Sequence, residues 1–274
     1  MPHAPPLLFA VLRLAGGGAL IIVIALALGR PFPTGTALHG LLFLGGLLNY
    51  AVFYAGLNYG VLFISAGETA ILNYTMPFWI AIFGRMVLGY RLGPARLAGL
   101  LLGFVGVVLV VADKLRPEAE PTWSAYLFVL AGALSWGAGS VFFVRYLSGV
   151  PLEWAVGLQN VYGAAPLALA WATIEGGRLP EPVFAFWLAL GFSVVLASFV
   201  AQLAFFSLLR RREAAVVGSY TFLVPVSAAV FGFLLLSEPV AAVALLGGVC
   251  VVVGISLVNR AARQVAEPAT RALI

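Results

Sequence analysis

The chain has 274 residues, of which 63% are hydrophobic and 9% are charged, with a formal net charge of +5 at pH 7. A water-soluble domain carries about 25% charged residues, so this composition excludes a protein whose whole surface faces water. The charged residues form short clusters between apolar runs of about 20 residues, the length that crosses a bilayer as a helix. We therefore predict an all-α polytopic membrane protein whose partner is the lipid bilayer and not nucleic acid.

Nine apolar runs, separated by charged residues, Pro and Gly, are expected to be transmembrane helices. The loops between them are short, so no soluble catalytic or ligand-binding domain is expected. In chain order the predicted helices are Leu7–Leu28, Leu38–Ile64, Thr69–Leu88, Ala95–Ala112, Trp123–Leu147, Leu152–Ile174, Val183–Leu209, Ala214–Leu236 and Val240–Asn259.

The residues needed for a metal centre or an enzyme active site are scarce. Cys250 is the single cysteine, and His3 and His39 are far apart in the sequence. No predicted helix carries a histidine, a pair of cysteines or a pair of carboxylates in its middle. We expect no enzyme activity, no metal and no cofactor.

Lys and Arg are distributed unequally between the two ends of the predicted helices. When successive loops are assigned to alternate sides, one side receives eleven of the 15 positive residues and the other receives three. The rule that cytoplasmic loops are enriched in Lys and Arg then predicts a cytoplasmic C-terminus and an extracytoplasmic N-terminus for this chain. The eleven residues are Arg30, Arg85, Arg91, Arg96, Arg145, Arg210, Arg211, Arg212, Arg260, Arg263 and Arg271.

The second half of the chain resembles the first half when the sequence is displaced by about 148 residues. The matching helices are five positions apart in the chain order, an odd displacement, so the two halves have opposite orientations in the membrane. A displacement of about 145 residues also aligns the first helix with Leu152–Ile174, so four helices in the first half match five in the second. The matching pairs include Pro77 with Pro225, Ala81 with Ala229, Gly84 with Gly232, Gly99 with Gly247, Gly106 with Gly254 and Pro6 with Pro151.

The repeat divides the chain into two predicted membrane domains. Residues 1–113 form the first half, residues 114–121 form an extracytoplasmic linker, residues 122–260 form the second half, and residues 261–274 form a cytoplasmic tail. Two inverted halves are typical of carriers that hold their solute near the middle of the bilayer.

Several motifs occur in an order and spacing that resembles the EamA type of the drug/metabolite transporter superfamily, over essentially the whole chain. Two departures stand out: the family's first helix has no counterpart here, and Gly89-Tyr90-Arg91 replaces a glutamate that usually follows the fourth helix. The motifs are Pro5-Pro6-Leu7-Leu8-Phe9-Ala10-Val11-Leu12-Arg13, Tyr74-Thr75-Met76-Pro77-Phe78-Trp79, Leu134-Ser135-Trp136-Gly137, Leu223-Val224-Pro225, Leu236-Ser237-Glu238 and Gly247 through Gly254.

This resemblance implies an inverted-repeat helical bundle with a five-plus-five pattern, present here as nine helices in a four-plus-five arrangement. It also implies a carrier in the inner (cytoplasmic) membrane that exports or exchanges small metabolites, including amino acids. The missing first helix is interpreted either as lost or as lying upstream of a misplaced start. A membrane scaffold without transport activity, or a truncated inactive paralogue, is the alternative.

Polar and aromatic residues inside the predicted helices are the candidate substrate-binding residues, because polar groups in the hydrocarbon region are costly unless they are satisfied. Tyr50, Tyr54 and Asn58 are spaced four apart on one helix face. Tyr and Trp at membrane interfaces, and Asn and Gln as links between helices, are the competing interpretation. The predicted binding residues are Tyr50, Tyr54, Asn58, Asn73, Tyr74, Trp79, Trp136, Asn160, Gln202 and Tyr220.

Charged residues inside the helices are few. Arg13 lies about two turns into the first helix, where it could meet a substrate carboxylate or have a structural role. No Asp or Glu lies in the middle of any predicted helix, which favours facilitated efflux or exchange over tight proton coupling.

Glycines in the last helix of each half are expected to allow close helix packing, either within the chain or at a dimer contact. They include Gly99, Gly103 and Gly106 in the first half and Gly247, Gly248 and Gly254 in the second. We expect a monomer or a weak homodimer.

Overall fold

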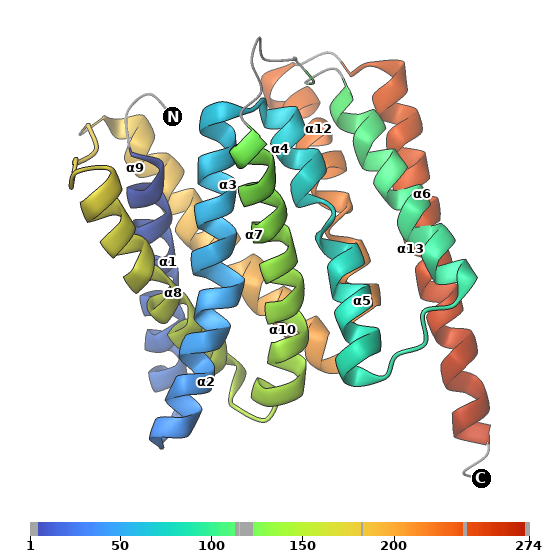
Figure 1. Ribbon diagram of the computed structural model, residues 1–274, viewed down its shortest axis with the longest axis horizontal. Coiled ribbons are helices and arrows are strands. Elements are labelled where there is room, and N and C mark those ends of the chain that lie inside the picture. Colours follow the sequence, from blue (N-terminus) through green and yellow to red (C-terminus); the bar gives the residue numbers. More distant parts are fainter. Residues whose placement is uncertain (1–4, 113–114, 116–122, 182, 238–239, 272–274) are drawn as a thin grey trace.

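The computed structural model describes residues 5–112, 115, 123–181, 183–237 and 240–271, and these residues form helices without any strand. The all-α prediction is confirmed. The predicted linker, residues 114–121, lies outside the described residues except for Leu115. Figure 1 shows the helices running roughly side by side, with the N- and C-termini at opposite ends of the bundle.

The helices of the first half follow the predicted order. The predicted start at Thr69 moves to Ala66, because Ser65 and Glu68 form a capping box that begins the helix earlier. The elements are α1 (Pro6–Ala27), α2 (Thr36–Gly46), η1 (Leu47–Ala51), α3 (Val52–Phe63), α4 (Ala66–Asn73), α5 (Met76–Leu88) and α6 (Pro94–Val111).

The second half contains five helical units. Its last helix continues to Arg271, so much of the segment predicted as a tail from residue 261 is helical. The elements are α7 (Trp123–Phe142), η3 (Phe143–Leu147), α8 (Leu152–Ile174), α9 (Phe184–Phe192), η4 (Ser193–Ala201), α10 (Gln202–Arg211), α11 (Ala214–Tyr220), α12 (Leu223–Leu236) and α13 (Ala242–Arg271).

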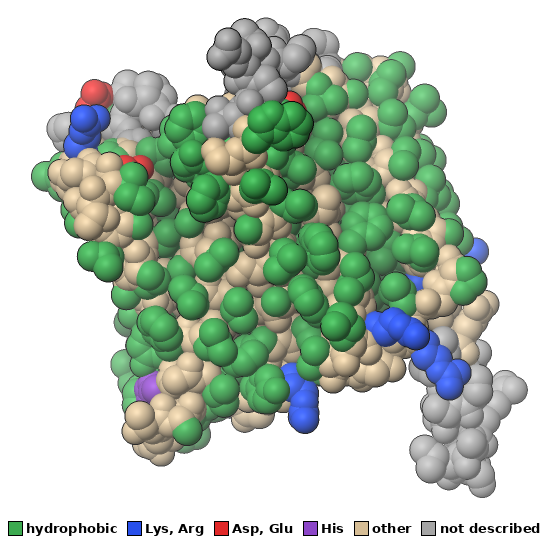
Figure 2. Space-filling view, viewed as in Figure 1, with side chains coloured by type: hydrophobic (Ala, Val, Ile, Leu, Met, Phe, Trp, Pro, Cys, Tyr) green, Lys and Arg blue, Asp and Glu red, His purple; other side chains and the backbone are tan. Residues whose placement is uncertain are grey.

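Within the described residues, eight of these units are long and apolar enough to cross a membrane. The ninth, α8, has 23 residues but carries Gln159 and Asn160, which lower its hydropathy. Figure 2 shows apolar side chains over the flank of the molecule, with Arg side chains near its two ends. We call the end that carries Arg30, Arg145 and Arg210 the arginine-rich end, and the other the opposite end.

Glycines bring α6 and α13, the last helices of the two halves, into close contact. A Cβ atom on Gly99 would lie 2.7 Å from the carbonyl oxygen of Gly254, and a Cβ on Gly106 would lie 2.6 Å from that of Gly247. In the sequence repeat, Gly99 matches Gly247 and Gly106 matches Gly254. Gly99 therefore faces the residue that matches Gly106, and Gly106 faces the residue that matches Gly99. This exchange is the geometry expected for two inverted halves related by a pseudo-two-fold axis.

Both halves carry the same two irregularities in their helices. The π-helical segment η1 lies about 146 residues before the start of η4, in the matching helix. The α4–α5 unit breaks before Pro77, and the α11–α12 unit breaks before Pro225. At the first break Thr75 donates from Oγ1 to the Leu72 carbonyl at 2.6 Å, and at the second Thr221 donates to the Gly218 carbonyl at 2.8 Å. Helix breaks and π-segments at membrane depth are frequent at functional sites.

The helix α7 covers one face of α3 and α5 in the first half. A Cβ on Gly137 would lie 2.5 Å from the Cβ of Trp79, so α7 and α5 are in close contact. In the second half, no described helix covers the matching face of α12, where Leu234 is 65% exposed and Leu235 is 76% exposed. The described helices of the two halves therefore number four units and five, as the sequence predicts.

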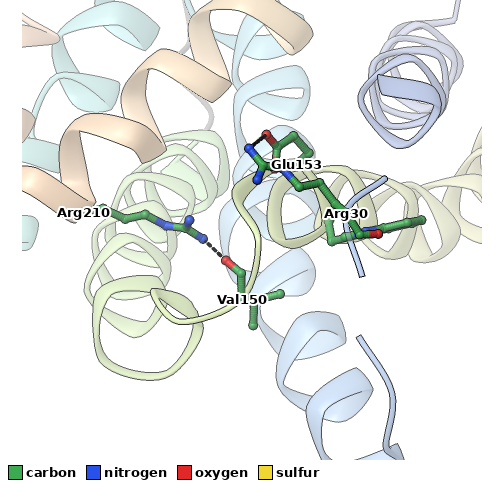
Figure 3. A network of polar contacts seen from close by, with 5 residues as sticks. Arg30, Val150, Glu153 and Arg210 are labelled. Atoms are coloured by element: carbon green, nitrogen blue, oxygen red, sulfur yellow. Dashed lines mark hydrogen bonds and ion pairs between the residues drawn. The ribbon is translucent and has the colours of Figure 1, made fainter. Parts of the chain in front are cut away.

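The antiparallel helices α1 and α8 pack along each other and are joined at both ends. At the opposite end, the Glu175 carboxylate accepts a hydrogen bond from the Leu7 amide at 3.0 Å. At the arginine-rich end, Arg30 lies 3.5 Å from Glu153, while Arg210 of α10 donates to the Val150 carbonyl just before α8 (Figure 3). These contacts fix the two helices that flank the centre of the bundle.

Candidate functional site

A group of polar side chains lies in the centre of the bundle, where α1, η1–α3, α8 and η4–α10 meet. Five of the six side chains are buried and Arg13 is partly buried, although the surrounding helices are apolar. We call the group the central polar cluster, and it consists of Arg13, Tyr50, Tyr54, Asn160, Ser198 and Gln202. Arg13 lies seven residues after the start of α1, which corresponds to about 10 Å along the helix axis.

Arg13 joins the two inverted halves. Its Nε atom donates a hydrogen bond to Ser198 Oγ of η4 at 3.0 Å, and its Cζ atom lies 4.8 Å from the ring centroid of Tyr54 on α3. The second contact is a cation–π interaction. Close packing of α1 on η4 depends on Gly17, since a Cβ on Gly17 would lie 2.4 Å from the Ser198 Cβ.

Asn160 of α8 makes the matching contacts on the other side of the pseudo-two-fold axis. Its Nδ2 atom donates to Gln202 Oε1 at 2.6 Å, and its side chain lies beside the Tyr50 hydroxyl. Tyr54 matches Gln202 and Tyr50 matches Ser198 in the sequence repeat. Arg13 contacts Tyr54 and Ser198, and Asn160 contacts Gln202 and Tyr50. Each of the two residues therefore contacts one member of each repeat-related pair.

Aromatic rings form the apolar wall next to the central polar cluster. The ring centroid of Trp136 lies 6.1 Å from that of Tyr50 and 4.7 Å from that of Phe53. On its other side, Trp136 contacts Phe205 at 5.7 Å and Phe206 at 6.4 Å, both from α10. An apolar wall beside a few polar atoms is the usual composition of a small-molecule site.

Several buried polar atoms in this region have no hydrogen-bond partner among the described residues. They include the Tyr50 hydroxyl, Trp136 Nε1, Asn160 Oδ1 and Gln202 Nε2. Unsatisfied buried polar groups are uncommon in proteins because each one costs free energy. Four such atoms around one aromatic wall are suited to orient a polar solute.

Asn49 and Gln159 belong to a neighbouring contact between helices. Asn49 Nδ2 donates to Gln159 Oε1 at 3.0 Å, and Gln159 Nε2 donates to the Ala155 carbonyl at 2.7 Å. Gly45 and Gly139 allow this approach, because a Cβ on either would lie within 2.6 Å of one of these side chains. This pair links η1 to α8 and is structural.

A cavity of about 910 Å³ opens at the opposite end of the bundle, between α1, α3, α7 and α8. Phe63 and Phe128 contribute apolar walls, and Glu175 and Arg178 contribute charged groups. Asn58, the third residue of the Tyr50–Tyr54 face, lines this cavity and donates to the Pro6 carbonyl at 3.2 Å. One turn deeper on α3 lies Tyr54, which belongs to the central polar cluster and contacts Arg13.

The arginine-rich end is closed near the second helix break. There α5 packs against α11, while their repeat counterparts α12 and α4 make no comparable contact among the described residues. Arg96, 2% exposed, lies 2.5 Å from Glu213 at the start of α11 and donates to the Arg91 carbonyl at 2.8 Å. Burial raises the pKa of the nearby Tyr90 phenol, and the Glu213 carboxylate raises it further.

The structure brings together five of the ten predicted binding residues: Tyr50, Tyr54, Trp136, Asn160 and Gln202. Asn58 lies at the cavity, as described above. The remaining four lie elsewhere: Asn73 and Tyr74 at the α4–α5 break, Trp79 on α5 against Phe83 and Gly137, and Tyr220 on α11, where its hydroxyl donates to Asn259 of α13 at 2.8 Å.

Sequence reasoning did not identify Ser198, Phe205 or Phe206. Ser198 and Phe206 lie 148 residues after Tyr50 and Asn58, so the repeat applied residue by residue would have selected them. Phe205 carries no such signal. No group of three or more His, Cys, Asp or Glu that could hold a metal ion occurs in the part of the chain that the structure describes.

Comparison with known proteins supports one family. The model of the EamA-like transporter family matches residues 1–112 and 123–260. A protein of known crystal structure superposes with a TM-score of 0.79 at 24% identity, covering 95% of this chain and 89% of that one. This superposition supports the bundle fold.

Several relatives of this chain are named as transporters. The uncharacterized transporter YvbV of Bacillus subtilis is 29% identical over 94% of this chain and 84% of its own length. The uncharacterized inner membrane transporter YedA of Escherichia coli K12 is 26% identical over 83% of this chain and 73% of its own length. The aromatic amino acid exporter YddG of Ancylobacter novellus is 32% identical over 56% of this chain and 53% of its own length.

Proposed function

Because this chain belongs to the EamA-like transporter family and is therefore a multi-pass membrane transporter, we propose that it exports or exchanges a small amphipathic metabolite such as an amino acid. The observation that carries this proposal is the central polar cluster, in which repeat-related residues from both halves surround unpartnered polar atoms beside an aromatic wall. A site shared by two inverted halves is accessible from either side if one half moves against the other.

The described arrangement fits a carrier that faces the extracytoplasmic side. The rule that positive residues gather inside the cell assigns the arginine-rich end to the cytoplasm. The 910 Å³ cavity then opens outward, and the α5–α11 contact with the Arg96–Glu213 pair closes the inward side. Inward opening would require α5 and α11 to separate and the matching α12 and α4 to approach each other.

Transport by this site needs no proton gradient. The acidic residues whose side chains the structure describes lie at helix ends or in loops, and they are Glu68, Glu153, Glu175, Glu181 and Glu213. A proton-coupled carrier usually has a titratable group on the solute pathway.

The inner membrane location, the cytoplasmic C-terminus and the monomeric or weakly dimeric state belong to the same proposal.

Reconstitution into liposomes tests the proposal. Liposomes loaded with unlabelled phenylalanine or leucine should accumulate the radiolabelled amino acid by exchange, with and without a pH gradient. Trp136→Ala should abolish exchange, because it removes the aromatic wall of the site. Trp123→Ala is the matched control, since Trp123 is 77% exposed at the far end of the same helix. Strict dependence on a pH gradient, or equal exchange by both variants, would contradict the proposal.

A further inference from the structure

We propose that the central polar cluster selects solutes that carry a carboxylate, and that Arg13 is the residue that sets this specificity. The inference rests on the carrier function proposed above and narrows its substrate class. It requires the solute to have an acidic group and an apolar body, and it makes an amino group optional. A cationic amphiphile is excluded.

The charge balance of the cluster is the first argument. Arg13 is the single charged residue of the cluster, and none of the acidic residues that the structure describes forms an ion pair with it. Glu153 pairs with Arg30, Glu213 pairs with Arg96, and the Glu68 and Glu175 carboxylates accept hydrogen bonds at helix ends. An unpaired cation inside a membrane protein is costly. Binding of an anion beside Arg13 is therefore favourable, and binding of a second cation there is unfavourable.

The geometry of the guanidinium group is the second argument. Arginine has five N–H donors, and here Nε alone is engaged, at Ser198 Oγ. No described residue accepts a hydrogen bond from Nη1 or Nη2. The stacking on Tyr54 holds one face of the guanidinium, and the edge with the Nη atoms remains available. A carboxylate matches two parallel N–H donors, which gives arginine its preference for this group.

The remaining atoms of the cluster do not provide an equivalent site for an ammonium group. Trp136 Nε1 and Gln202 Nε2 are donors, and Asn160 Oδ1 and the Tyr50 hydroxyl are neutral acceptors. An ammonium group would find neutral oxygens and ring faces but no carboxylate. The carboxylate of an amino acid therefore contributes more to binding than its amine, and a deaminated acid keeps most of the affinity.

A purely structural arginine would give different results from a specificity residue. If Arg13 only joined α1 to α3 and η4, removing its charge would lower the melting temperature and weaken the binding of all ligands to the same extent. As a specificity residue, Arg13 affects carboxylates alone. Lysine at this position keeps the charge but not the two parallel donors, so Arg13→Lys should retain acid selectivity with lower affinity.

Ligand-induced thermal stabilisation of the purified full chain in lipid nanodiscs tests the inference. The probes are phenylalanine, 3-phenylpropionate, 2-phenylethylamine and phenylalaninamide, which vary the acid and the amine separately. The two carboxylates should raise the melting temperature, and the other two should not. Arg13→Gln should weaken both acids by about 10- to 100-fold, the range expected for a lost charge-assisted interaction. Arg85→Gln, a charge change at the exposed end of α5, should leave the preference unchanged.

Each result of the stabilisation experiment either supports or overturns the proposed carboxylate specificity. Equal stabilisation by the amine and the acid, or an unchanged preference in Arg13→Gln, overturns the proposed specificity but leaves the carrier function standing if exchange persists. Stabilisation by the acids and its loss in Arg13→Gln support it. Absence of stabilisation by all four probes, together with amino-acid exchange in liposomes, also overturns the proposed specificity. If the probes give no stabilisation and the liposomes show no amino-acid exchange, the proposed carrier function is overturned as well.

Discussion

Tyr54 and Gln202, 148 residues apart, occupy equivalent positions in the two inverted halves, and each contacts the polar residue of a flanking helix. The Arg13 guanidinium lies 4.8 Å from the Tyr54 ring centroid, and Asn160 donates to Gln202 at 2.6 Å. The same geometry thus presents a cation on an aromatic ring in one half and an amide pair in the other. A symmetric scaffold with asymmetric side chains can recognise a solute whose two ends differ.

Gly17→Ala tests the close approach of α1 to η4. The new Cβ would lie 2.4 Å from the Ser198 Cβ, so α1 must move away and take Arg13 with it. Overpacking of this kind costs about 1–3 kcal/mol. We expect a lower melting temperature and loss of amino-acid exchange. Gly40→Ala in α2 is the control, because a Cβ there meets nothing within 4 Å, and equal effects of the two substitutions would show that the contact is unimportant.

Glu213→Gln tests the buried ion pair at the arginine-rich end. Arg96 is 2% exposed and Glu213 is 27% exposed, so the substitution leaves Arg96 without its charged partner. Breaking a fully buried pair costs about 3–5 kcal/mol, and partial exposure of Glu213 reduces the expected loss to about 2–3 kcal/mol.

Glu153→Gln is the matched control for this measurement. It disrupts the 3.5 Å pair with Arg30, in which Glu153 is 15% exposed but Arg30 is 51% exposed, and a pair with one half-exposed partner contributes about 1 kcal/mol or less. Chemical denaturation of the two variants in the same detergent gives both values. Similar losses of stability in the two variants would contradict the structural role assigned to Arg96.

Trp136→Phe separates binding from stability at the aromatic wall. The substitution keeps a ring beside Tyr50 and Phe53 but removes the Nε1 donor, which has no partner among the described residues. Loss of one hydrogen bond to the solute should weaken binding by about 3- to 10-fold, with little change in melting temperature. Trp136→Ala should in addition destabilise the protein by about 3–5 kcal/mol. Unchanged solute affinity in Trp136→Phe would remove Nε1 from the site.

Single-cysteine labelling tests the orientation. In a Cys250→Ala background, Arg178→Cys and Arg212→Cys place one thiol at each end of the bundle, and both positions are exposed. If the arginine-rich end faces the cytoplasm, a membrane-impermeant maleimide added to intact cells should label position 178 and spare position 212. Permeabilised cells should label both. The reverse pattern in intact cells would invert the proposed topology.

The sequence alone determined the environment, the approximate helix positions and the inverted repeat. Apolar runs of fixed length and an odd displacement of five helices between matching segments can be counted along the chain, so they do not depend on tertiary contacts. The face shared by Tyr50 and Tyr54 also follows from helix periodicity. The start of α4 at Ala66 also has a local cause, the capping box formed by Ser65 and Glu68.

Only the tertiary structure decided which polar residues meet. Tyr220 and Gln202 look alike in the sequence, yet Tyr220 bonds Asn259 while Gln202 bonds Asn160. In a helix of a soluble protein, the apolar face indicates the side that packs inward. A membrane helix is apolar on all sides, so its sequence does not show which side packs inward. Pairing of Arg13 with Ser198, 185 residues away, depends on the antiparallel packing of two halves that no local pattern encodes.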